Sequence, residues 1–390
     1  MTPDALRIGF MPLVDAAPLV VAAEMGFAEE EGLYLVLEPS PSWSALRDKL
    51  SFGHLEAAHM LSPVPVAGAL GLGGGGAILH ALSVLSVNGN VIGVSPEIAA
   101  EMRAAGHGFG FYDARAAGEA LIAVKRDLRV GVPFPFSMHA ELVYYWLSAL
   151  GLPAPQSLIV RTVPPPQMAE AMAAGEIDAF CVGEPWGSRS VENGVGELLV
   201  PGSAIWSFAP EKVLAVRSDW ADDKRDLSQR LIRAVWRASR WLSHPDSIAV
   251  ATEMMSKDHY LGLAPELLER ALQGTFVINR RGETRSVDGF VEFHDGAAGF
   301  PWRSQAEWIG RQLALRTGLD REKSAEAASA TFRSDIYRAA LKGVAHDMPL
   351  ASSKVEGAID VPIAVGSTGG RLILSRDRFF DGRIFEPSGG

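Results

Sequence analysis

The first 60 residues alternate short apolar runs with longer stretches in which apolar positions recur every three or four residues. The apolar runs 6–10, 33–40 and 55–60 predict three strands. The periodic stretches 18–26 and 42–53 predict helices between them. Strands and helices that alternate in this way are typical of a largely parallel sheet with helices on both faces. Such sheets bind ligands beyond the carboxyl ends of their strands.

A second series of the same kind begins after residue 90. It predicts strands, separated by helices, over 128–133, 157–163, 177–182 and 197–201. The apolar stretch 212–220 would then return the chain to the first sheet. We therefore expect two lobes, in which lobe 1 combines residues 1–90 and 213–390 and lobe 2 comprises residues 91–212.

The chain changes character beyond residue 226, where the pattern becomes strongly helical. The stretch 227–242 is the clearest amphipathic helix, with an apolar stripe along one face. We expect this C-terminal half to extend lobe 1. The last segment, 371–390, predicts a short strand followed by a mobile tail.

The formal net charge of −10 over 390 residues limits the partners of the chain. Direct binding to nucleic acid or to an anionic membrane needs a basic face, so we expect neither. The apolar runs end well short of the ~20 residues that a membrane span needs. From Met1 the chain enters the first predicted strand without a recognisable export signal, which predicts a cytoplasmic location.

Two basic side chains lie where predicted strands and helices meet. His139 falls in the first turn of a helix, where unpaired N–H groups and the helix dipole favour a bound anion. Lys212 stands at the head of the apolar stretch 212–220, and a lysine suits a compact monoanion. A structural histidine and an exposed lysine at a strand end remain the alternatives for these two positions.

Four further positions are candidates for the walls of a small site. Trp43 follows a predicted N-cap, so its ring could line a ligand while its indole N–H donates. Asn90 could donate from its amide where the chain crosses between the lobes. Pro165 lies in a run of three prolines, and Gly183 permits close backbone approach. Core packing for Trp43 and a turn role for Asn90 are the alternatives.

Signals of catalysis are poor in this sequence. It contains no G-x-S-x-G motif, and its nine histidines show neither an H-E-x-x-H motif nor close Cys/His spacing. The glycine run 70–76 follows a predicted helix rather than a strand, which argues against a dinucleotide site. We therefore predict a binding protein rather than an enzyme, with no metal and no cofactor.

Several segments taken together resemble a known family. The chain is similar over roughly residues 6–220 to the nitrate-binding, NrtA-like branch of ABC-transporter solute-binding proteins. The segments that carry this resemblance are RIGFMPLVDAAPLVVAAEMGF, SWSALRDKL, LEAAH, PPPQM, FCVGEPW and PEKVLAV. The resemblance implies an α/β, two-lobed, periplasmic-binding-protein-like (type II) fold with the ligand in a cleft between the lobes and a helical C-terminal extension. It places these residues around the ligand: Trp43, Asn90, His139, Pro165, Gly183 and Lys212.

The resemblance also bears on the ligand and the role. Bicarbonate-binding relatives carry a carboxylate at the position of Lys212, so the lysine favours nitrate or nitrite. Asn90 stands where nitrate transporters of this kind carry a glutamine, which keeps an amide but shortens it. Members without an export signal resemble the cytoplasmic NasS-type nitrate/nitrite sensors.

For a sensor of that type, the implied partner is an ANTAR-type, NasT-like antiterminator protein that binds RNA and is released when the ligand binds. The first alternative is the solute-binding component of a nitrate ABC transporter. The second is an enzyme on the same fold that makes thiamine precursors or menaquinone intermediates.

Overall fold

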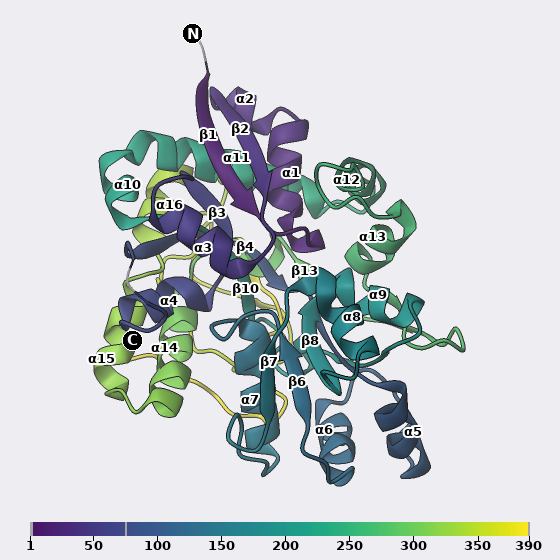
Figure 1. Cartoon of the computed structure of the whole chain (residues 1–390). Coiled ribbons are helices and arrows are strands. Elements are labelled where there is room, and N and C mark those ends of the chain that lie inside the picture. Colours follow the sequence, from purple (N-terminus) through teal and green to yellow (C-terminus); the bar gives the residue numbers. More distant parts are fainter. Residues whose placement is uncertain (1–2, 75, 389–390) are drawn as a thin grey trace.

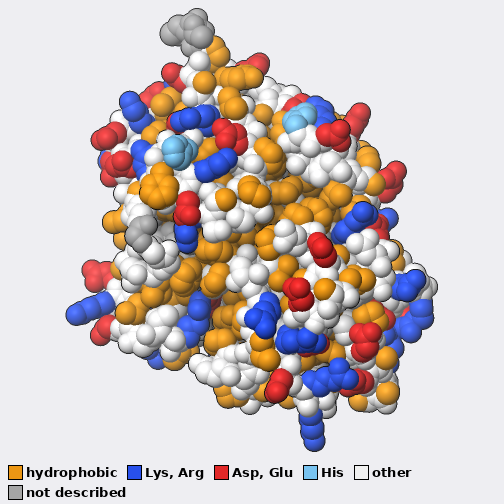
Figure 2. Space-filling model, in the orientation of Figure 1, with side chains coloured by type: hydrophobic (Ala, Val, Ile, Leu, Met, Phe, Trp, Pro, Cys, Tyr) orange, Lys and Arg blue, Asp and Glu red, His pale blue; other side chains and the backbone are white. Residues whose placement is uncertain are grey.

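Two lobes, each built around its own β-sheet, make up the molecule (Figure 1). The computed structural model describes residues 3–74 and 76–388. Basic and acidic side chains are interspersed over the face shown in Figure 2, and apolar side chains gather along the boundary between its upper and lower parts. Within the described residues, no helix combines the length and the hydropathy that a bilayer crossing requires.

Lobe 1 contains a six-stranded sheet of mixed direction. Its strands, in spatial order, are β13 (Val291–Glu292), β4 (Leu79–Asn88), β10 (Pro210–Arg217), β3 (Ala57–Leu61), β1 (Asp4–Phe10) and β2 (Leu33–Pro39). β1 pairs in parallel with β2 and β3, whereas β10 pairs antiparallel with β3 and β4. The sheet is therefore mixed rather than parallel throughout, because β10 and β13 run against β1, β2, β3 and β4.

Lobe 2 contains a five-stranded sheet. Its strands, in spatial order, are β7 (Ile159–Thr162), β6 (Arg129–Val132), β8 (Ala179–Gly183), β5 (Asn90–Val94) and β9 (Glu197–Pro201). β6 runs parallel to β7 and β8, and β5 runs antiparallel to β8 and β9. Gly89 alone separates β4 of lobe 1 from β5 of lobe 2, and its φ of 98° permits the turn between the two sheets.

Helices and short elements complete the two lobes. The helices around the lobe 2 sheet are α5 (Pro96–Ala104), α6 (Ala114–Ala123), α7 (Met138–Ala149), α8 (Met168–Ala173) and α9 (Trp186–Glu192). Those of lobe 1 and the C-terminal half are α1 (Ala17–Glu24), α2 (Phe27–Glu30), α3 (Trp43–Ser51), α4 (Pro63–Ala69), α10 (Ser218–Asp223), α11 (Arg225–Leu242), α12 (Ser247–Met255), α13 (Pro265–Leu272), α14 (Arg303–Thr317), α15 (Arg321–Ser329) and α16 (Ser334–Leu341). Short strands and 3-10 turns are β11 (Thr275–Val277), β12 (Thr284–Ser286), β14 (Ile363–Ala364), β15 (Ile373–Leu374), η1 (Val14–Ala16), η2 (Pro165–Gln167), η3 (Gly202–Ala204) and η4 (Asp295–Ala297).

The amphipathic helix expected over 227–242 is α11, and it supports lobe 1. Its buried side, which includes Leu231 and Val235, packs in a bundle with α1, α2 and α16. Arginines on the same helix reach the edge of the first sheet: Arg230 lies 2.8 Å from Asp4, and Arg233 lies 2.6 Å from Glu31. The apolar stripe therefore packs α11 against the neighbouring helices of lobe 1, and the arginine ion pairs set the position of α11 along the edge of the sheet.

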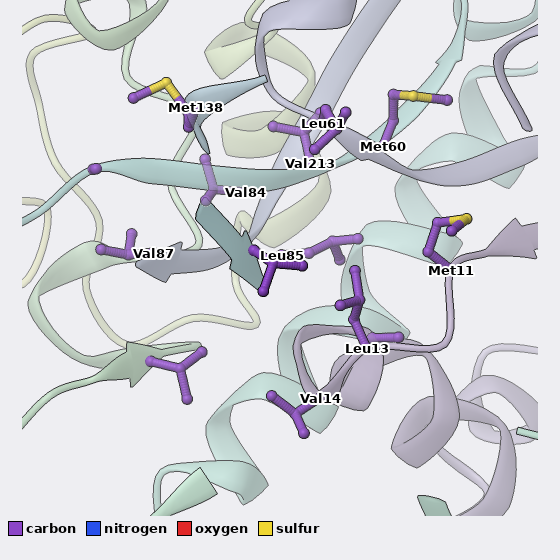
Figure 3. Close-up of a cluster of buried hydrophobic side chains, with 14 of the residues drawn as sticks. Met11, Leu13, Val14, Met60, Leu61, Val84, Leu85, Val87, Met138 and Val213 are labelled. Carbon is purple, nitrogen blue, oxygen red and sulfur yellow. The ribbon is translucent and has the colours of Figure 1, made fainter. Parts of the chain in front are cut away.

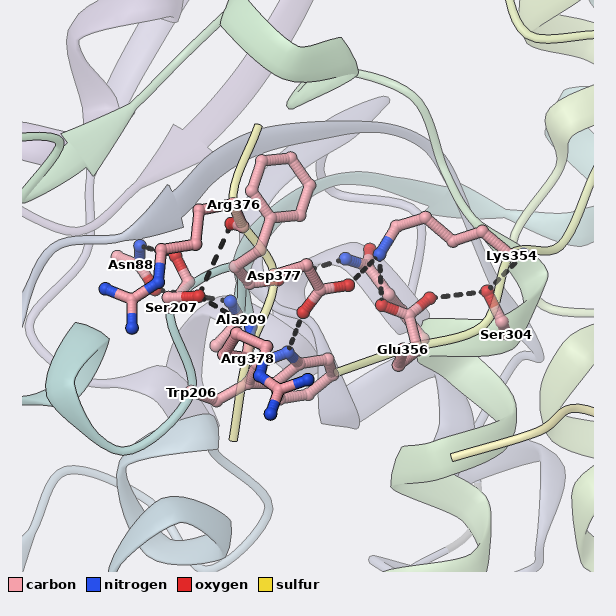
Figure 4. A network of polar contacts seen from close by, with 12 residues as sticks. Asn88, Trp206, Ser207, Ala209, Ser304, Lys354, Glu356, Arg376, Asp377 and Arg378 are labelled. Atoms are coloured by element: carbon pink, nitrogen blue, oxygen red, sulfur yellow. Dashed lines mark hydrogen bonds and ion pairs between the residues drawn. The ribbon is translucent and has the colours of Figure 1, made fainter. Parts of the chain in front are cut away.

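The end of the chain forms a strap that is anchored in both lobes (Figure 4). We call residues 343–388 the C-terminal strap. Within it, the Trp206 indole of lobe 2 donates to Asp377 Oδ1 at 2.7 Å, and the Tyr145 hydroxyl of α7 donates to Asp381 Oδ1 at 2.9 Å. Phe379 is buried against Trp206 with ring centroids 4.7 Å apart. The expectation of a mobile tail over 371–390 is therefore wrong for its described part.

An apolar cluster lies where the two lobes meet (Figure 3). Leu13, Leu61 and Val213 come from lobe 1, and Met138 comes from the first turn of α7 in lobe 2. All four side chains are fully buried. Because Leu61 faces Lys212 in the β3–β10 pair, this cluster packs directly beside the polar residues described next.

Candidate functional site

Lobe 1 contributes one face of a buried polar cluster. Trp43 begins α3 directly after Ser42, whose hydroxyl accepts from the Ala45 N–H and caps the helix. Asp15 lies in η1, just beyond the carboxyl end of β1, and His59 lies in β3. All of these cluster side chains are almost completely buried. The first three strands and their connections therefore deliver an indole, a carboxylate and an imidazole to one edge of the sheet.

A bulge in β10 adds two charged residues to the same face. Pro210 pairs with Val87 while Lys212 pairs with Ser86, so Glu211 is the extra residue between them. The bulge brings neighbouring side chains together: Lys212 Nζ donates to Glu211 Oε1 at 3.0 Å. Both side chains are fully buried.

Lobe 2 supplies the opposite face. His139 lies in the first turn of α7, which Ser137 caps by accepting from the Ala140 N–H. Asn90, expected at the end of lobe 1, begins β5 of lobe 2, whereas Lys212, expected in lobe 2, lies on β10 of the lobe 1 sheet. Gly183 ends the neighbouring strand β8 directly opposite Asn90. A Cβ on Gly183 would lie 3.7 Å from His139 Nε2 and 3.0 Å from Leu13 Cδ2. Glycine therefore lets lobe 2 approach lobe 1 closely at this point.

Lys212 and Asp15 form a buried ion pair across the cluster. Lys212 Nζ lies 2.7 Å from Asp15 Oδ2, and His59 Nε2 lies 3.0 Å from Asp15 Oδ1. Burial opposes ionisation of Asp15, but Lys212 and His59 hold its pKa well below the ordinary value. Burial likewise opposes the charge on Lys212, while Asp15 and Glu211 together raise its pKa. Both groups are therefore charged near neutral pH.

Glu211 is a second buried carboxylate, and it bridges the two lobes. Asn90 Nδ2 donates to its Oε2 at 2.7 Å, and His139 Nδ1 lies 3.1 Å from its Oε1 at an angle poor for a regular hydrogen bond. Burial raises the pKa of Glu211 to about 7, although Lys212 and Asn90 favour its ionised form. Glu211 therefore changes its charge close to physiological pH.

Two N–H-bearing rings remain without a regular hydrogen-bond partner. Trp43 Nε1 and His139 Nε2 are both buried, and neither is hydrogen-bonded to any residue in the described ranges. The Lys212 ammonium lies 5.6 Å from the centre of the Trp43 ring. Buried polar groups without partners are costly and mark places where a ligand or water completes the structure. The cluster thus combines an ammonium, an indole N–H and an imidazole where the lobes meet.

Five of the six residues predicted from the sequence are placed in or against this cluster: Trp43, Asn90, His139, Gly183 and Lys212. Asn90 differs from the prediction in one respect. Its amide Nδ2 donates to Glu211, whereas the sequence had suggested that it would donate to a ligand. Pro165 begins η2 beyond β7, and within the described chain no hydrogen bond or ion pair joins it to the cluster.

Three members of the cluster were not predicted from the sequence: Asp15, His59 and Glu211. Asp15 follows the first predicted strand at its carboxyl end, which was a usable signal for a site residue. Glu211 adjoins Lys212, but adjacent residues of a regular strand point to opposite faces. Only the bulge explains why both lie in the site, and the sequence did not indicate it.

The donors in the cluster are suited to binding a small anion. Across residues 3–74 and 76–388, no three His, Cys, Asp or Glu side chains are grouped so as to hold a metal ion. An ammonium between indole and imidazole N–H groups can hold a small anion through directed hydrogen bonds. The two carboxylates limit this ability unless one of them is protonated.

Comparisons with known proteins agree with this architecture. Residues 1–256 match the model of the NMT1-like family. The nitrate/nitrite binding protein NrtA of Synechococcus elongatus is 29% identical over 98% of this chain and 83% of that protein. The bicarbonate transport ATP-binding protein CmpC of the same organism is 33% identical over 68% of this chain and only 39% of its own length.

A solved structure agrees over nearly the whole chain. The crystal structure of the periplasmic nitrate-binding protein NrtA from Synechocystis PCC 6803 superposes with a TM-score of 0.84 and 25% identity, over 99% of this chain and 96% of that one. The two-lobed, periplasmic-binding-protein-like fold expected from the sequence is therefore confirmed. Because the family match covers well over half of its residues, the chain belongs to the NMT1-like family.

Proposed function

We propose that the chain binds nitrate or nitrite in the buried cluster between its lobes. One observation carries this proposal. A lysine ammonium, an indole N–H and an imidazole, from Lys212, Trp43 and His139, converge where two lobes meet, and neither ring nitrogen has a hydrogen-bond partner among the residues that the structure describes. Similarity to NrtA over 98% of the chain supports the same ligand. The role is binding rather than catalysis, since the relatives named above are transport proteins.

The choice of anion follows from the charge at Lys212. Nitrate and nitrite only accept hydrogen bonds, so they suit a site whose ammonium and ring N–H groups donate. Bicarbonate also carries a hydroxyl that must donate, and the acceptors it would meet here are the carboxylates of Asp15 and Glu211, which already contact Lys212. Similarity to CmpC makes bicarbonate the anion to test against nitrate.

Isothermal titration calorimetry of the whole chain tests this proposal. We expect saturable heats with sodium nitrate or sodium nitrite, and much weaker binding of bicarbonate at the same pH. Binding of bicarbonate in preference to both nitrogen oxyanions would overturn the proposed ligand. An absence of heat with all three anions, in a protein whose circular dichroism shows it to be folded, would overturn the anion site itself.

As the finer role, we propose a cytoplasmic sensor that releases an ANTAR-type antiterminator partner when the anion binds. A site buried between two lobes supports this role, because an anion that stabilises one arrangement of the lobes changes the surface they share. The net charge of −10 suits a division of labour in which the partner contacts RNA. The alternative, a solute-binding component of a nitrate ABC transporter, is favoured by the similarity to NrtA.

A pull-down from cells with and without nitrate distinguishes these roles. The sensor proposal expects a partner with an RNA-binding domain to be captured without nitrate and released with it. Capture of a membrane permease and its ATPase would support the transporter instead. A partner retained equally in both conditions would contradict ligand-dependent release.

Trp43→Phe tests the proposed donor from the indole ring. The substitution removes a buried N–H that lacks a partner in the described protein but also shrinks a buried ring, so the free energy of unfolding should fall by about 1–2 kcal/mol. Nitrate affinity should fall by roughly 5- to 10-fold, the equivalent of one hydrogen bond of about 1–1.5 kcal/mol. Calorimetry and thermal unfolding measure the two effects separately.

Trp302→Phe is the matched control, because Trp302 is also buried and its Nε1 also lacks a partner within the described ranges. It lies before α14, beside Phe300, and should leave nitrate affinity unchanged. Equal affinities in wild type and Trp43→Phe would remove the indole from the site.

A further inference from the structure

The cluster between the lobes holds more negative than positive formal charge. Asp15 and Glu211 are carboxylates, Lys212 is the ammonium that contacts both, and all three are fully buried. Burial holds the pKa values of His59 and His139 below their ordinary value, so both imidazoles are neutral at neutral pH. An arriving anion adds a further negative charge to a region where water cannot screen it. Such an accumulation is costly unless a positive charge arrives with the anion.

The position of His139 gives a second reason, which depends on geometry alone. Its Nδ1 lies 3.1 Å from Glu211 Oε1. When Glu211 is ionised, its oxygen at this distance favours the neutral imidazole with the proton on Nδ1, because a lone pair facing a carboxylate oxygen would be repelled. Nε2 then carries a lone pair and cannot donate to an anion. With a proton on Glu211, Nδ1 can accept from it, and Nε2 carries the N–H.

We propose that anion binding is coupled to uptake of one proton by Glu211, which switches His139 to the tautomer that donates from Nε2 to the anion. This inference rests on the proposed function of the site. The proton comes from solvent and ends on Glu211 Oε1, and no covalent bond of the anion changes. Glu211 is thus a positioning residue that acts through His139.

The other groups around Glu211 leave it as the proton acceptor. Lys212 on β10 is already protonated, and Asn90 on β5 does not titrate. Asp15 in η1 stays ionised because Lys212 and His59 both contact it. Burial raises the pKa of Cys181 on β8 well above its ordinary value, so it remains a neutral thiol. The pKa of Glu211, raised to about 7 by burial, lies where a modest change of environment protonates it.

The coupling fixes the direction of the pH dependence. Below pH 7 Glu211 is already protonated in the free protein, so affinity is highest and level there. Above pH 7 each binding event must take up a proton, and the affinity falls by up to tenfold per pH unit. From pH 7 to pH 9 the expected loss is about 50-fold. Nitrate itself does not titrate in this range, so the loss reports on the protein.

Calorimetry of the whole chain with sodium nitrate measures the coupling directly. Titrations at pH 8.5 in Tris and in triethanolamine, whose ionisation enthalpies differ, should show uptake of about one proton per nitrate. Glu211→Gln removes the titrating group while its amide can still donate to His139 Nδ1. This variant should bind nitrate with an affinity that is level from pH 6 to pH 9, and with no proton uptake.

Glu184→Gln is the matched control. Burial also raises the pKa of Glu184 to about 7, but its carboxylate accepts from the Ser188 N–H at the start of α9. This variant should keep both the pH dependence and the proton uptake of wild type.

Nitrate binding by wild type without proton uptake, at an affinity level across pH 6–9, would overturn the inference and leave the proposed function standing. Proton uptake that persists in Glu211→Gln would overturn the assignment to Glu211. A folded wild-type protein that binds nitrate at no pH would instead overturn the proposed function, and the inference with it.

Discussion

Removing the ammonium of Lys212 is expected to weaken nitrate binding by about 10- to 150-fold, the equivalent of one charge-assisted hydrogen bond of about 1.5–3 kcal/mol. Lys212→Met keeps the apolar stem, which packs beside the cluster of Leu61 and Val213, and deletes only the charge. The loss should lie toward the upper end, because Asp15 and Glu211 then face the anion uncompensated. Calorimetry at pH 6.5 gives the affinity.

The same substitution leaves buried carboxylates without their cation and so should destabilise the fold. Lys212→Met combined with Glu211→Gln removes one of those carboxylates and should recover much of the stability without recovering affinity. Lys323→Met, an exposed lysine on α15, is the control and should change neither property. If Lys212→Met bound nitrate as tightly as wild type, Lys212 would have no part in the site.

The largest loss of stability is expected from Lys354→Met in the C-terminal strap. The Lys354 side chain is only 8% exposed and bonds to the buried carboxylates of Glu356 and Asp377 (Figure 4). Deleting the cation of a buried ion pair costs about 3–5 kcal/mol, because the remaining charges stay buried and uncompensated. Urea unfolding at neutral pH measures the change in the free energy of unfolding, with Lys323→Met again as the exposed control.

The deficit of Lys354→Met should depend on pH. Burial raises the pKa of Glu356 to about 8, above its value in the unfolded chain. The folded state therefore binds more protons than the unfolded state between about pH 4.5 and 8, and this carboxyl group contributes less stability as the pH rises. Without the lysine the effect grows, so the deficit should be larger at pH 9 than at pH 5. A deficit under about 1 kcal/mol at both pH values would contradict a buried triad.

The regular alternation of the first 60 residues predicted β1, α1, β2, α3 and β3 with bounds that differ from the structure by no more than a few residues. Periodicity is a local property, and it was sufficient there. The mixed direction of the lobe 1 sheet was not predictable in this way. The run 79–94 is buried almost throughout, and only the short Asn-Gly-Asn sequence at 88–90 marks the point where it passes from one sheet to the other.

Some site residues were likewise predictable from the local sequence, whereas others are placed by contacts between distant segments. Trp43 and His139 follow serine caps at helix starts, and such positions can be recognised from the sequence. Glu211 enters the site through a bulge that depends on pairing with β4, more than 120 residues earlier. The strap is fixed by contacts such as Trp206 to Asp377 over 171 positions, so its order could not be inferred from its own polar composition.

A crystal structure of the protein grown with sodium nitrate would show whether the cluster between the lobes binds the anion. We expect a planar anion there, within hydrogen-bond distance of Lys212 Nζ, Trp43 Nε1 and His139 Nε2. A nitrate ion bound elsewhere, with Lys212 still held by both Asp15 and Glu211 and both ring nitrogens without a ligand, would contradict this expectation.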